Sequence, residues 1–136
     1  MVFITRRERF SAAHRLFNPS WTDERNDTIY GGCANSNWHG HNYELWITVK
    51  GEVKQDLGYL VDLKLLSSLI REHITSKLDH KNINIEVGFM KGKMVSTENL
   101  AIAIWEEIEP YLKAIDVDLH RVKIQETENN FVEYFG

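Results

Sequence analysis

The stretch HGHNYELWITVK, residues 39–50, decides the fold because it reads as a strand with reactive side chains at its start. Alternate side chains of an extended strand lie on one face, so His39 and His41 share a face with three apolar residues, Leu45, Ile47 and Val49. This alternation is typical of a half-buried strand. Two imidazoles on one face can reach a single metal ion. The stretch therefore predicts half of a zinc site at the end of a buried face.

Three further segments are predicted to be strands. Residues 2–14 alternate loosely and end at His14, which indicates a long first strand. Residues 119–126 alternate between apolar and polar side chains, a turn follows at Asn129 and Asn130, and residues 131–135 close a hairpin.

Two helices are predicted between these strand pairs. Asp62 is expected to cap a helix that ends near Asp79 and His80. Ser96 begins a second helix with its hydroxyl as the cap, and Pro110 is expected to bend or shorten that helix late in its course. The residues expected on the buried faces are Leu63, Leu66, Ile70, Ile74 and Leu78 in the first helix, and Leu100, Ala103, Ile104, Ile108 and Leu112 in the second.

The order strand, strand, helix, helix, strand, strand predicts an α+β fold, a four-stranded antiparallel sheet with both helices on one face. Large apolar or aromatic side chains such as Phe3, Trp46 and Tyr134 occur at both parities of the strands. One layer of helices cannot cover both faces of a sheet. We therefore expect a homo-oligomer that covers the second face or the strand edges.

Size and composition limit the class of protein. The chain has 136 residues, 43% of them hydrophobic and 26% charged, which predicts one domain over residues 1–136. No apolar run approaches the roughly 20 residues that span a bilayer, so a soluble, cytoplasmic protein is expected. The net charge of −4 argues against a nucleic-acid binder. The single cysteine, Cys33, cannot form an internal disulfide.

His14 is the best candidate for a third metal ligand, because it ends one strand as His39 begins another. Three neutral imidazoles leave a fourth position of zinc open for water or a substrate oxygen, which is the arrangement of a catalytic site. Two other histidines, His73 and His120, carry no such pattern and are interpreted as ordinary surface or core residues.

Cys33 has three interpretations: an inert buried thiol, a fourth ligand that closes a structural zinc site, or a catalytic base or nucleophile. It lies in a polar segment, residues 18–37, that is predicted to be a loop of a length usually found in lids and binding loops. Polar surroundings argue against the buried thiol. A nearby cation or histidine would lower the thiol pKa and make it a base near neutral pH.

Two acidic residues, Asp79 and Glu126, are further candidates for function. Asp79 precedes His80, and a carboxylate that fixes the tautomer of an imidazole suits proton relay to a thiol, although helix ends often carry such residues as caps. Glu126 shares the parity of Val122 and Ile124. If that face is buried, a ligand with paired N–H donors would satisfy the carboxylate; otherwise Glu126 faces water at a strand end.

Five motifs together resemble those of the 6-pyruvoyl-tetrahydropterin synthase family, in the same order and over essentially the whole chain. They are FSAAHRL (10–16), CANSNWHGHNY (33–43), LDHKN (78–82), STEN (96–99) and QET (125–127). The resemblance implies that three subunits close their sheets into a barrel and that two trimers stack into a homohexamer. It also implies conversion of 7,8-dihydroneopterin triphosphate to 6-pyruvoyl-tetrahydropterin with loss of triphosphate.

The resemblance further implies a role for each site residue. Zn²⁺ would be held by His14, His39 and His41 and would acidify the neighbouring C–H groups of the substrate. Cys33 would accept a proton, and His80, oriented by Asp79, would return or relay it. The pterin would be anchored by Glu126 with help from Ser96 and Thr97.

A related enzyme, 6-carboxytetrahydropterin synthase of deazapurine (queuosine) synthesis, uses the same substrate and zinc site and remains an alternative. Its cysteine commonly stands four positions before the first histidine, whereas Cys33 stands six before His39. Trp38 replaces the usual glycine before the His-Gly-His motif, and its indole would reshape the side-chain pocket.

A non-catalytic, zinc-stabilised pterin-binding oligomer is a further alternative. The triphosphate of the substrate needs cations, and the candidates by proximity in sequence are Arg15, Lys77 and Lys81.

Overall fold

The computed structural model describes all residues from Met1 to Gly136. Two long strands form the centre of the sheet, β1 (Val2–His14) and β2 (His39–Gly51), and they pair antiparallel over their whole lengths. β4 (Asp118–Gln125) pairs antiparallel with β2, and β5 (Phe131–Tyr134) completes a hairpin with β4. The predicted strands and hairpin are confirmed within one or two residues at each end.

The sheet has five strands and is mixed, so the expectation of four antiparallel strands was wrong in this detail. A two-residue strand, β3 (Lys81–Asn82), pairs parallel with Ala12 and Ala13 of β1, giving the order β3-β1-β2-β4-β5. His80 has φ 60°, a left-handed backbone that turns the chain from the preceding helix onto the edge of β1. A strand of two residues is too short to produce the alternation by which strands are recognised.

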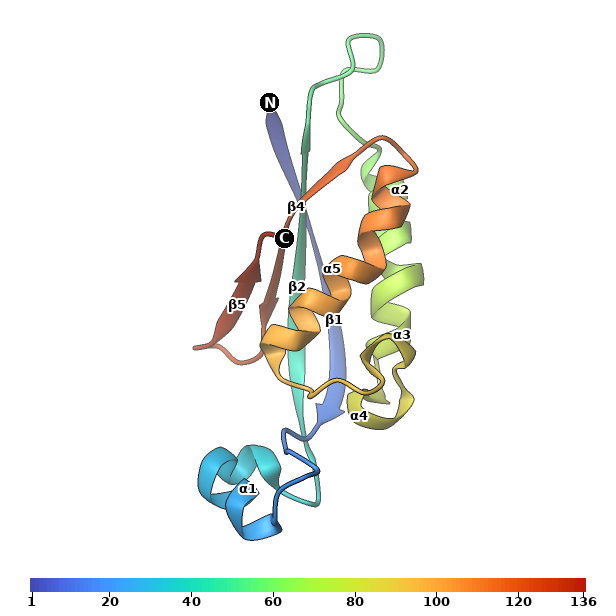
Figure 1. The fold of residues 1–136 in the computed structure, drawn as a ribbon. Coiled ribbons are helices and arrows are strands. Elements are labelled where there is room, and N and C mark those ends of the chain that lie inside the picture. Colours follow the sequence, from blue (N-terminus) through green and yellow to red (C-terminus); the bar gives the residue numbers. More distant parts are fainter.

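Both predicted helices lie on one face of the sheet (Figure 1). The first consists of α2 (Leu63–Ile70), a π-helical turn η2 (Arg71–Thr75) and α3 (Ser76–Leu78), and Asp62 caps it as expected. Its buried residues recur every four positions: Leu66, Ile70, Ile74 and Leu78 are fully buried, whereas Leu63 is exposed. A spacing of four exceeds the 3.6 residues of an α-helical turn, and the wider π-turn keeps these side chains on one face.

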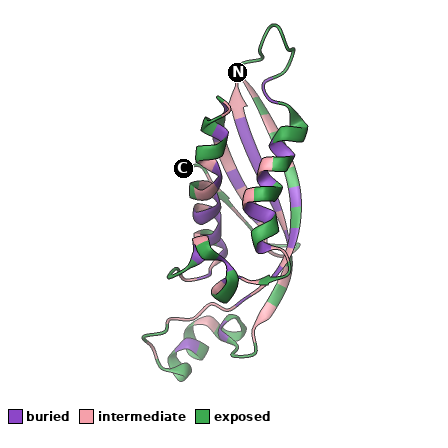
Figure 2. Cartoon of the chain, turned by 90° about the vertical axis from the view of Figure 1, so that its right-hand side faces the viewer, coloured by how far each residue is buried: buried purple, intermediate pink, exposed green.

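The second helix, α5 (Thr97–Lys113), begins after the N-cap Ser96, and all five of its predicted core residues are buried. Pro110 does not end it, since the helix continues to Lys113. A short helix α4 (Ile83–Glu86) and the 3-10 turn η3 (Gly88–Met90) lie between the two main helices in sequence. Figure 2 shows buried segments where helices and sheet face each other and exposed segments on the outer helix surfaces.

The segment predicted as a long loop contains a helix, α1 (Asp23–Tyr30), and a 3-10 turn, η1 (Gly31–Ala34). α1 lies beyond the end of the sheet, away from α2 and α5 (Figure 1). Its sequence DERNDTIY carries no apolar stripe, which is the signal by which helices are predicted. The helix is held by its Thr22 cap and by buried Asn26, which bonds to Asn18.

The face of the sheet opposite the helices carries exposed aromatic side chains, among them Phe3, Phe131 and Phe135, each more than half exposed. Tyr134, by contrast, packs against the core beside Trp105 of α5. None of the helices has the length and apolar character needed to cross a membrane.

Candidate metal centre and active site

The strand pairing brings three histidines together. His14, the last residue of β1, is the cross-strand partner of His39, the first residue of β2, and His41 lies two residues further on the same face. One ring nitrogen from each imidazole lies within 4.8 Å of the other two, and the ring centroids are 4.4–5.1 Å apart. Gly40 separates the two β2 histidines where a side chain would press on the backbone, since an added Cβ would lie 3.1 Å from the Ala12 carbonyl oxygen.

Each of the three imidazoles presents a buried nitrogen with no hydrogen-bond partner: His14 Nε2, His39 Nδ1 and His41 Nε2. For His14 the tautomer follows from its other nitrogen, because Nδ1 lies 3.0 Å from the Val95 carbonyl oxygen, which can only accept. His14 Nε2 therefore carries a lone pair directed away from Val95. Buried polar atoms are normally satisfied, and three converging lone pairs fit a divalent cation such as Zn²⁺.

Burial and neighbouring groups shift the pKa values of two of the three imidazoles. Burial lowers the pKa of His14, and the neighbouring His39 and His41 lower it further. Burial also lowers the pKa of His39, with a contribution from His41. Both shifts favour the neutral form of His14 and His39, in which a ring nitrogen can bind a metal.

Beside the cluster lies a pocket of about 370 Å³ whose lining includes His14, Cys33, Ser96, Thr97 and Glu126. Cys33 is exposed, which excludes the buried inert thiol. Its sulfur is not a member of the three-histidine cluster, although it lines the same pocket. The arrangement matches an open metal position with a thiol nearby better than a closed four-ligand shell.

Two hydrogen bonds hold the turn that carries Cys33 next to the histidine cluster. Leu16 N–H donates to the Cys33 carbonyl oxygen at 2.8 Å, and the Arg15 guanidinium donates to the Ala34 carbonyl oxygen at 2.8 Å. These bonds attach the turn η1 to the residues that directly follow His14. The thiol is therefore positioned by the chain that carries one of the three imidazoles.

Glu126 is partly buried at the end of β4 and faces the cluster. One carboxylate oxygen accepts a hydrogen bond from the Thr97 hydroxyl, and the other lies 3.4 Å from His41 Nε2. The contact with His41 lacks hydrogen-bond geometry, which agrees with the unpartnered state of that nitrogen. Ser96 lines the same pocket, but its hydroxyl accepts the Asn99 N–H as the cap of α5.

The backbone of Ser11 fixes Asp79 and His80 as a unit. Ser11 N–H donates to Asp79 Oδ1 at 2.8 Å, and the Ser11 carbonyl oxygen accepts His80 N–H at 2.6 Å. Asp79 Oδ2 lies 2.9 Å from His80 Nδ1, so the carboxylate orients the imidazole as expected. The Ser11 N–H lowers the pKa of Asp79, and His80 contributes to the same effect.

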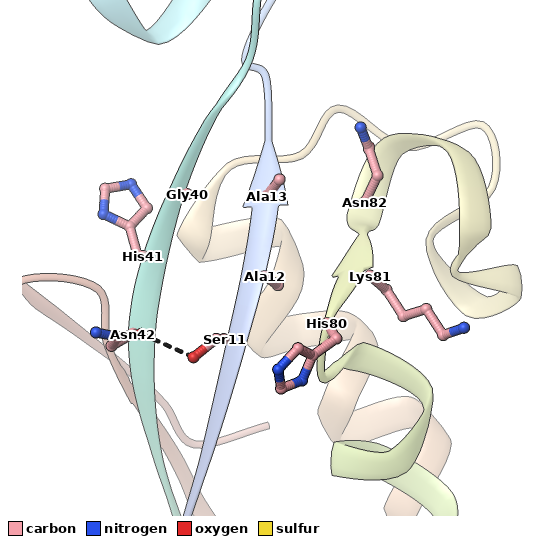
Figure 3. A pocket seen from close by; sticks show the side chains of 9 residues that line it. All are labelled: Ser11, Ala12, Ala13, Gly40, His41, Asn42, His80, Lys81 and Asn82. Carbon is pink, nitrogen blue, oxygen red and sulfur yellow. Dashed lines mark hydrogen bonds between the residues drawn. The ribbon is translucent and has the colours of Figure 1, made fainter.

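Within one chain the Asp79–His80 unit does not reach Cys33. His80 is largely exposed and lines a different pocket with Ser11, Asn42 and Lys81. Figure 3 shows His80 and Lys81 on the β3 side of β1, whereas the ring of His41, which also lines this pocket, lies on the far side of β2. The expected proton relay from His80 to Cys33 is therefore not assembled by a single subunit.

Comparison with known proteins agrees with this site. A protein-family model described as 6-pyruvoyl tetrahydropterin synthase matches residues 3–136. The chain belongs to this family. A 6-pyruvoyl tetrahydrobiopterin synthase of Dictyostelium discoideum is 47% identical over 135 residues, which are 99% of this chain and 96% of that protein. The expectation of an enzyme of the 6-pyruvoyl-tetrahydropterin synthase type, a carbon–oxygen lyase, is confirmed.

A solved structure of the Caenorhabditis elegans 6-pyruvoyl tetrahydropterin synthase has a TM-score of 0.92 and 35% identity, covering 99% of this chain and 95% of that one. A 6-carboxy-5,6,7,8-tetrahydropterin synthase of Rickettsia typhi is more distant, at 29% identity over 150 residues, with 98% and 99% covered. The similarity is therefore greater to the pyruvoyl-forming relatives.

For this member of the pterin synthase family, sequence reasoning did not find every residue that packs against or orients the three histidines. Tyr43, two residues after His41, is buried against two of the histidines, and its alternation with His39 and His41 was the available signal. The Val95 carbonyl that orients His14 could not be found from residue types, because any residue carries such a group.

Trp38 does not line the pocket that it was expected to reshape, and the three cations expected to bind the triphosphate make other contacts. Trp38 lines a separate pocket with Phe17, Met94 and Val95 rather than the pocket of Cys33. The Lys77 ammonium bonds to Glu107 at 2.7 Å. Of the three cations, Lys81 lines the pocket of His80, and the Arg15 guanidinium bonds to Ala34.

Proposed function

We propose that this protein is a zinc-dependent lyase that converts 7,8-dihydroneopterin triphosphate to 6-pyruvoyl-tetrahydropterin and triphosphate. The observation that carries the proposal is the convergence of three buried, unpartnered imidazole nitrogens beside a pocket lined by Cys33 and Glu126. Membership of the pterin synthase family and the high identity to pyruvoyl-forming relatives support the same reaction.

His14, His39 and His41 would hold the zinc ion. When bound, Zn²⁺ acts as a Lewis acid on substrate side-chain oxygens and makes the adjacent C–H protons more acidic. Cys33 is the candidate base, since its thiol is exposed in the pocket and is fixed by the backbone bonds of η1. As a thiolate it would take the proton released from the substrate side chain.

Glu126 would anchor the pterin. A carboxylate can accept two parallel hydrogen bonds from an amino group and a neighbouring ring N–H, and such paired, charge-assisted bonds also fix the orientation of a flat ring. The Thr97 hydroxyl donates to this carboxylate and holds it at the mouth of the pocket. Ser96 would contribute through its position at the start of α5 rather than through its hydroxyl, which caps the helix.

We further propose that Asp79 and His80 serve the Cys33 pocket of a neighbouring subunit in a homohexamer built from two trimers. The preformed Asp79–His80 unit and its position outside the pocket that Cys33 lines in the same chain support a shared site. Exposed aromatic residues on the open face of the sheet support closure of three sheets into a barrel, because large apolar surfaces on soluble proteins usually mark interfaces. A single-domain, cytoplasmic protein remains a prediction from the sequence.

The alternative product is 6-carboxytetrahydropterin, which the more distant bacterial relative is named for. Product analysis decides between the two: zinc-loaded protein incubated with dihydroneopterin triphosphate is expected to release triphosphate and the pyruvoyl product, identified by mass. Acetaldehyde together with a carboxylated pterin would assign the alternative reaction.

The Cys33→Ala variant is expected to lose nearly all activity, and unchanged activity would reject the thiolate as the base. If the protein were a non-catalytic pterin-binding module with a closed zinc shell, Cys33 would resist alkylation in the zinc-loaded form. A catalytic thiol is expected to react readily and to be protected by substrate.

A further inference from the structure

Tyr43 is a buried residue next to the three-histidine cluster, and its phenol hydroxyl has no hydrogen-bond partner. The residue is 1% exposed, and its ring stacks on Phe10, its cross-strand neighbour, with 4.8 Å between centroids. Its ring also lies edge-on to His14 and His41, with centroids 6.0 and 5.5 Å away. The ring is therefore held beside two of the three imidazoles by packing on both sides.

An unpartnered buried hydroxyl is unfavourable for folding, because the group loses its hydrogen bonds to water and gains none in return. Phenylalanine would fill the same space between Phe10 and the histidines without this penalty. The protein nevertheless carries a hydroxyl at this point. Unfavourable groups of this kind are concentrated at functional sites, where they are satisfied by a ligand.

The charges around the hydroxyl determine its protonation state. Burial raises the pKa of Tyr43, and the nearby carboxylate of Glu126 raises it further. Glu126 lines the pocket beside the cluster. The O–H group of a phenol is a hydrogen-bond donor.

The other unpartnered atoms of the site are of the opposite kind. His14 Nε2, His39 Nδ1 and His41 Nε2 are nitrogens suited to a cation, whereas the Tyr43 hydroxyl is suited to an anion or to an oxygen with free lone pairs. A cation held by three neutral histidines keeps its positive charge and binds a further ligand at its open position. A donor next to that position would favour ligands that can accept a hydrogen bond.

We propose that Tyr43 is a positioning residue of the metal site, whose hydroxyl donates a hydrogen bond to an oxygen ligand at the open metal position. Tyr43 thereby gives the site a preference for anionic oxygen ligands over nitrogen ligands that have no remaining lone pair. This inference rests on the proposed metal site, but it concerns a residue outside the three ligands and the base.

Two small ligands test the preference without the enzymatic reaction. The Co²⁺-substituted protein is titrated with acetohydroxamate, an oxygen ligand that accepts hydrogen bonds, and with imidazole, whose coordinated form has no lone pair left, and both are followed by the visible spectrum of the metal. In the Tyr43→Phe variant we expect acetohydroxamate to bind about 2- to 10-fold more weakly, the loss of one neutral hydrogen bond, and imidazole to bind unchanged.

The outcomes separate this inference from the proposed function. Equal affinities of wild type and Tyr43→Phe for acetohydroxamate, or equal weakening of both ligands, would overturn the role of Tyr43 while leaving the metal site and the lyase activity intact. Absence of a Co²⁺ spectrum in the wild type would overturn both proposals. A wild type that binds Co²⁺ with the expected ligand preference but releases no triphosphate from the pterin substrate would overturn the reaction alone.

Unfolding of the metal-free protein provides the structural control. We expect metal-free Tyr43→Phe to be at least as stable toward urea as the wild type, because the buried hydroxyl has no protein partner. Tyr134→Phe, at a half-buried tyrosine packed on Trp105, is the matched control and is expected to leave both ligand affinities unchanged. A clear loss of stability in Tyr43→Phe would assign the hydroxyl to folding and reject the proposal.

Discussion

Ser11 and Asp79 are joined by a hydrogen bond of 2.8 Å from the backbone N–H of β1 to the carboxylate that follows α3. The Ser11 carbonyl oxygen accepts the His80 N–H as well, so one residue of the strand fixes both members of the pair. Backbone groups of a central strand are rigid supports. The orientation of His80 is thus set by the sheet rather than by the loop that carries it.

This bond predicts a pH dependence of stability. The Ser11 N–H lowers the pKa of Asp79 below its usual value of about 3.8, so the unfolded chain takes up this proton at a higher pH than the folded chain does. The stabilisation is complete above that usual value and is lost as the pH falls through the lower folded pKa. Urea unfolding between pH 5 and about 2 is expected to show a smaller acid-induced loss of stability in Asp79→Asn than in the wild type. An identical pH dependence in both proteins would contradict this assignment.

Removal of one imidazole is expected to abolish tight zinc binding. Loss of a group that merely orients a ligand lowers metal affinity by about 10- to 100-fold, so His39→Ala should lower it by more than about 100-fold, measured by competition with a chromophoric chelator. His73→Ala is the matched control, because His73 stacks on Tyr111 outside the cluster. Chelation of zinc should lower the melting temperature of the wild type and of the control but not of His39→Ala.

Mixed oligomers test whether the active site is shared between subunits. Cys33→Ala and His80→Ala chains are each expected to be inactive alone, and co-assembly in equal amounts should restore about a quarter of the sites, those with intact Cys33 from one chain and intact His80 from its neighbour. Cys33→Ala mixed with Glu126→Ala is the control, since both residues line one pocket of a single chain. Recovery in the control, or none in the test mixture, would reject the shared site.

The backbone conformation of Trp38 predicts that glycine and alanine at this position differ in their effect on stability. Its φ of 68° is left-handed, which is unfavourable by about 1–2 kcal/mol for a residue with a side chain and is free for glycine. Trp38→Gly and Trp38→Ala both lose the packing of the indole, but only the alanine variant keeps the backbone strain. Urea unfolding should therefore find Trp38→Gly about 1 kcal/mol more stable than Trp38→Ala. The reverse order would mean that the loop adopts another conformation once the indole is removed.

The sequence predicted those parts of the molecule that alternate or repeat over many residues. Residues 2–14 and 39–50 carry enough alternation to define two long strands, and the residues at Leu66, Ile70, Ile74 and Leu78 define a helix face. Two features that depend on few residues were not predicted. The two-residue strand β3 follows from the left-handed turn at His80. The polar helix α1 is held by its cap and by Asn26 rather than by an apolar face.

The candidate site was predictable where its residue types are rare and unpredictable where its geometry depends on the backbone. Three histidines at strand ends, one cysteine and one glutamate at a buried parity are distinctive in sequence. The separation of His80 from Cys33 could not be foreseen, because a sequence does not state on which side of β1 a following turn leaves its side chains. The Val95 carbonyl that orients His14 likewise could not be predicted from the sequence.

The segment that connects β1 to β2 is held together where it leaves and rejoins the sheet. His14 pairs with His39 there, and Leu16 and Arg15 donate hydrogen bonds to η1. Residues 18–30 therefore take no part in the strand pairing and hydrogen bonds that hold the imidazoles and the thiol in place. This outlying segment is a natural position for grafting foreign peptides or for divergence in length among relatives, while the chemistry at its base is preserved.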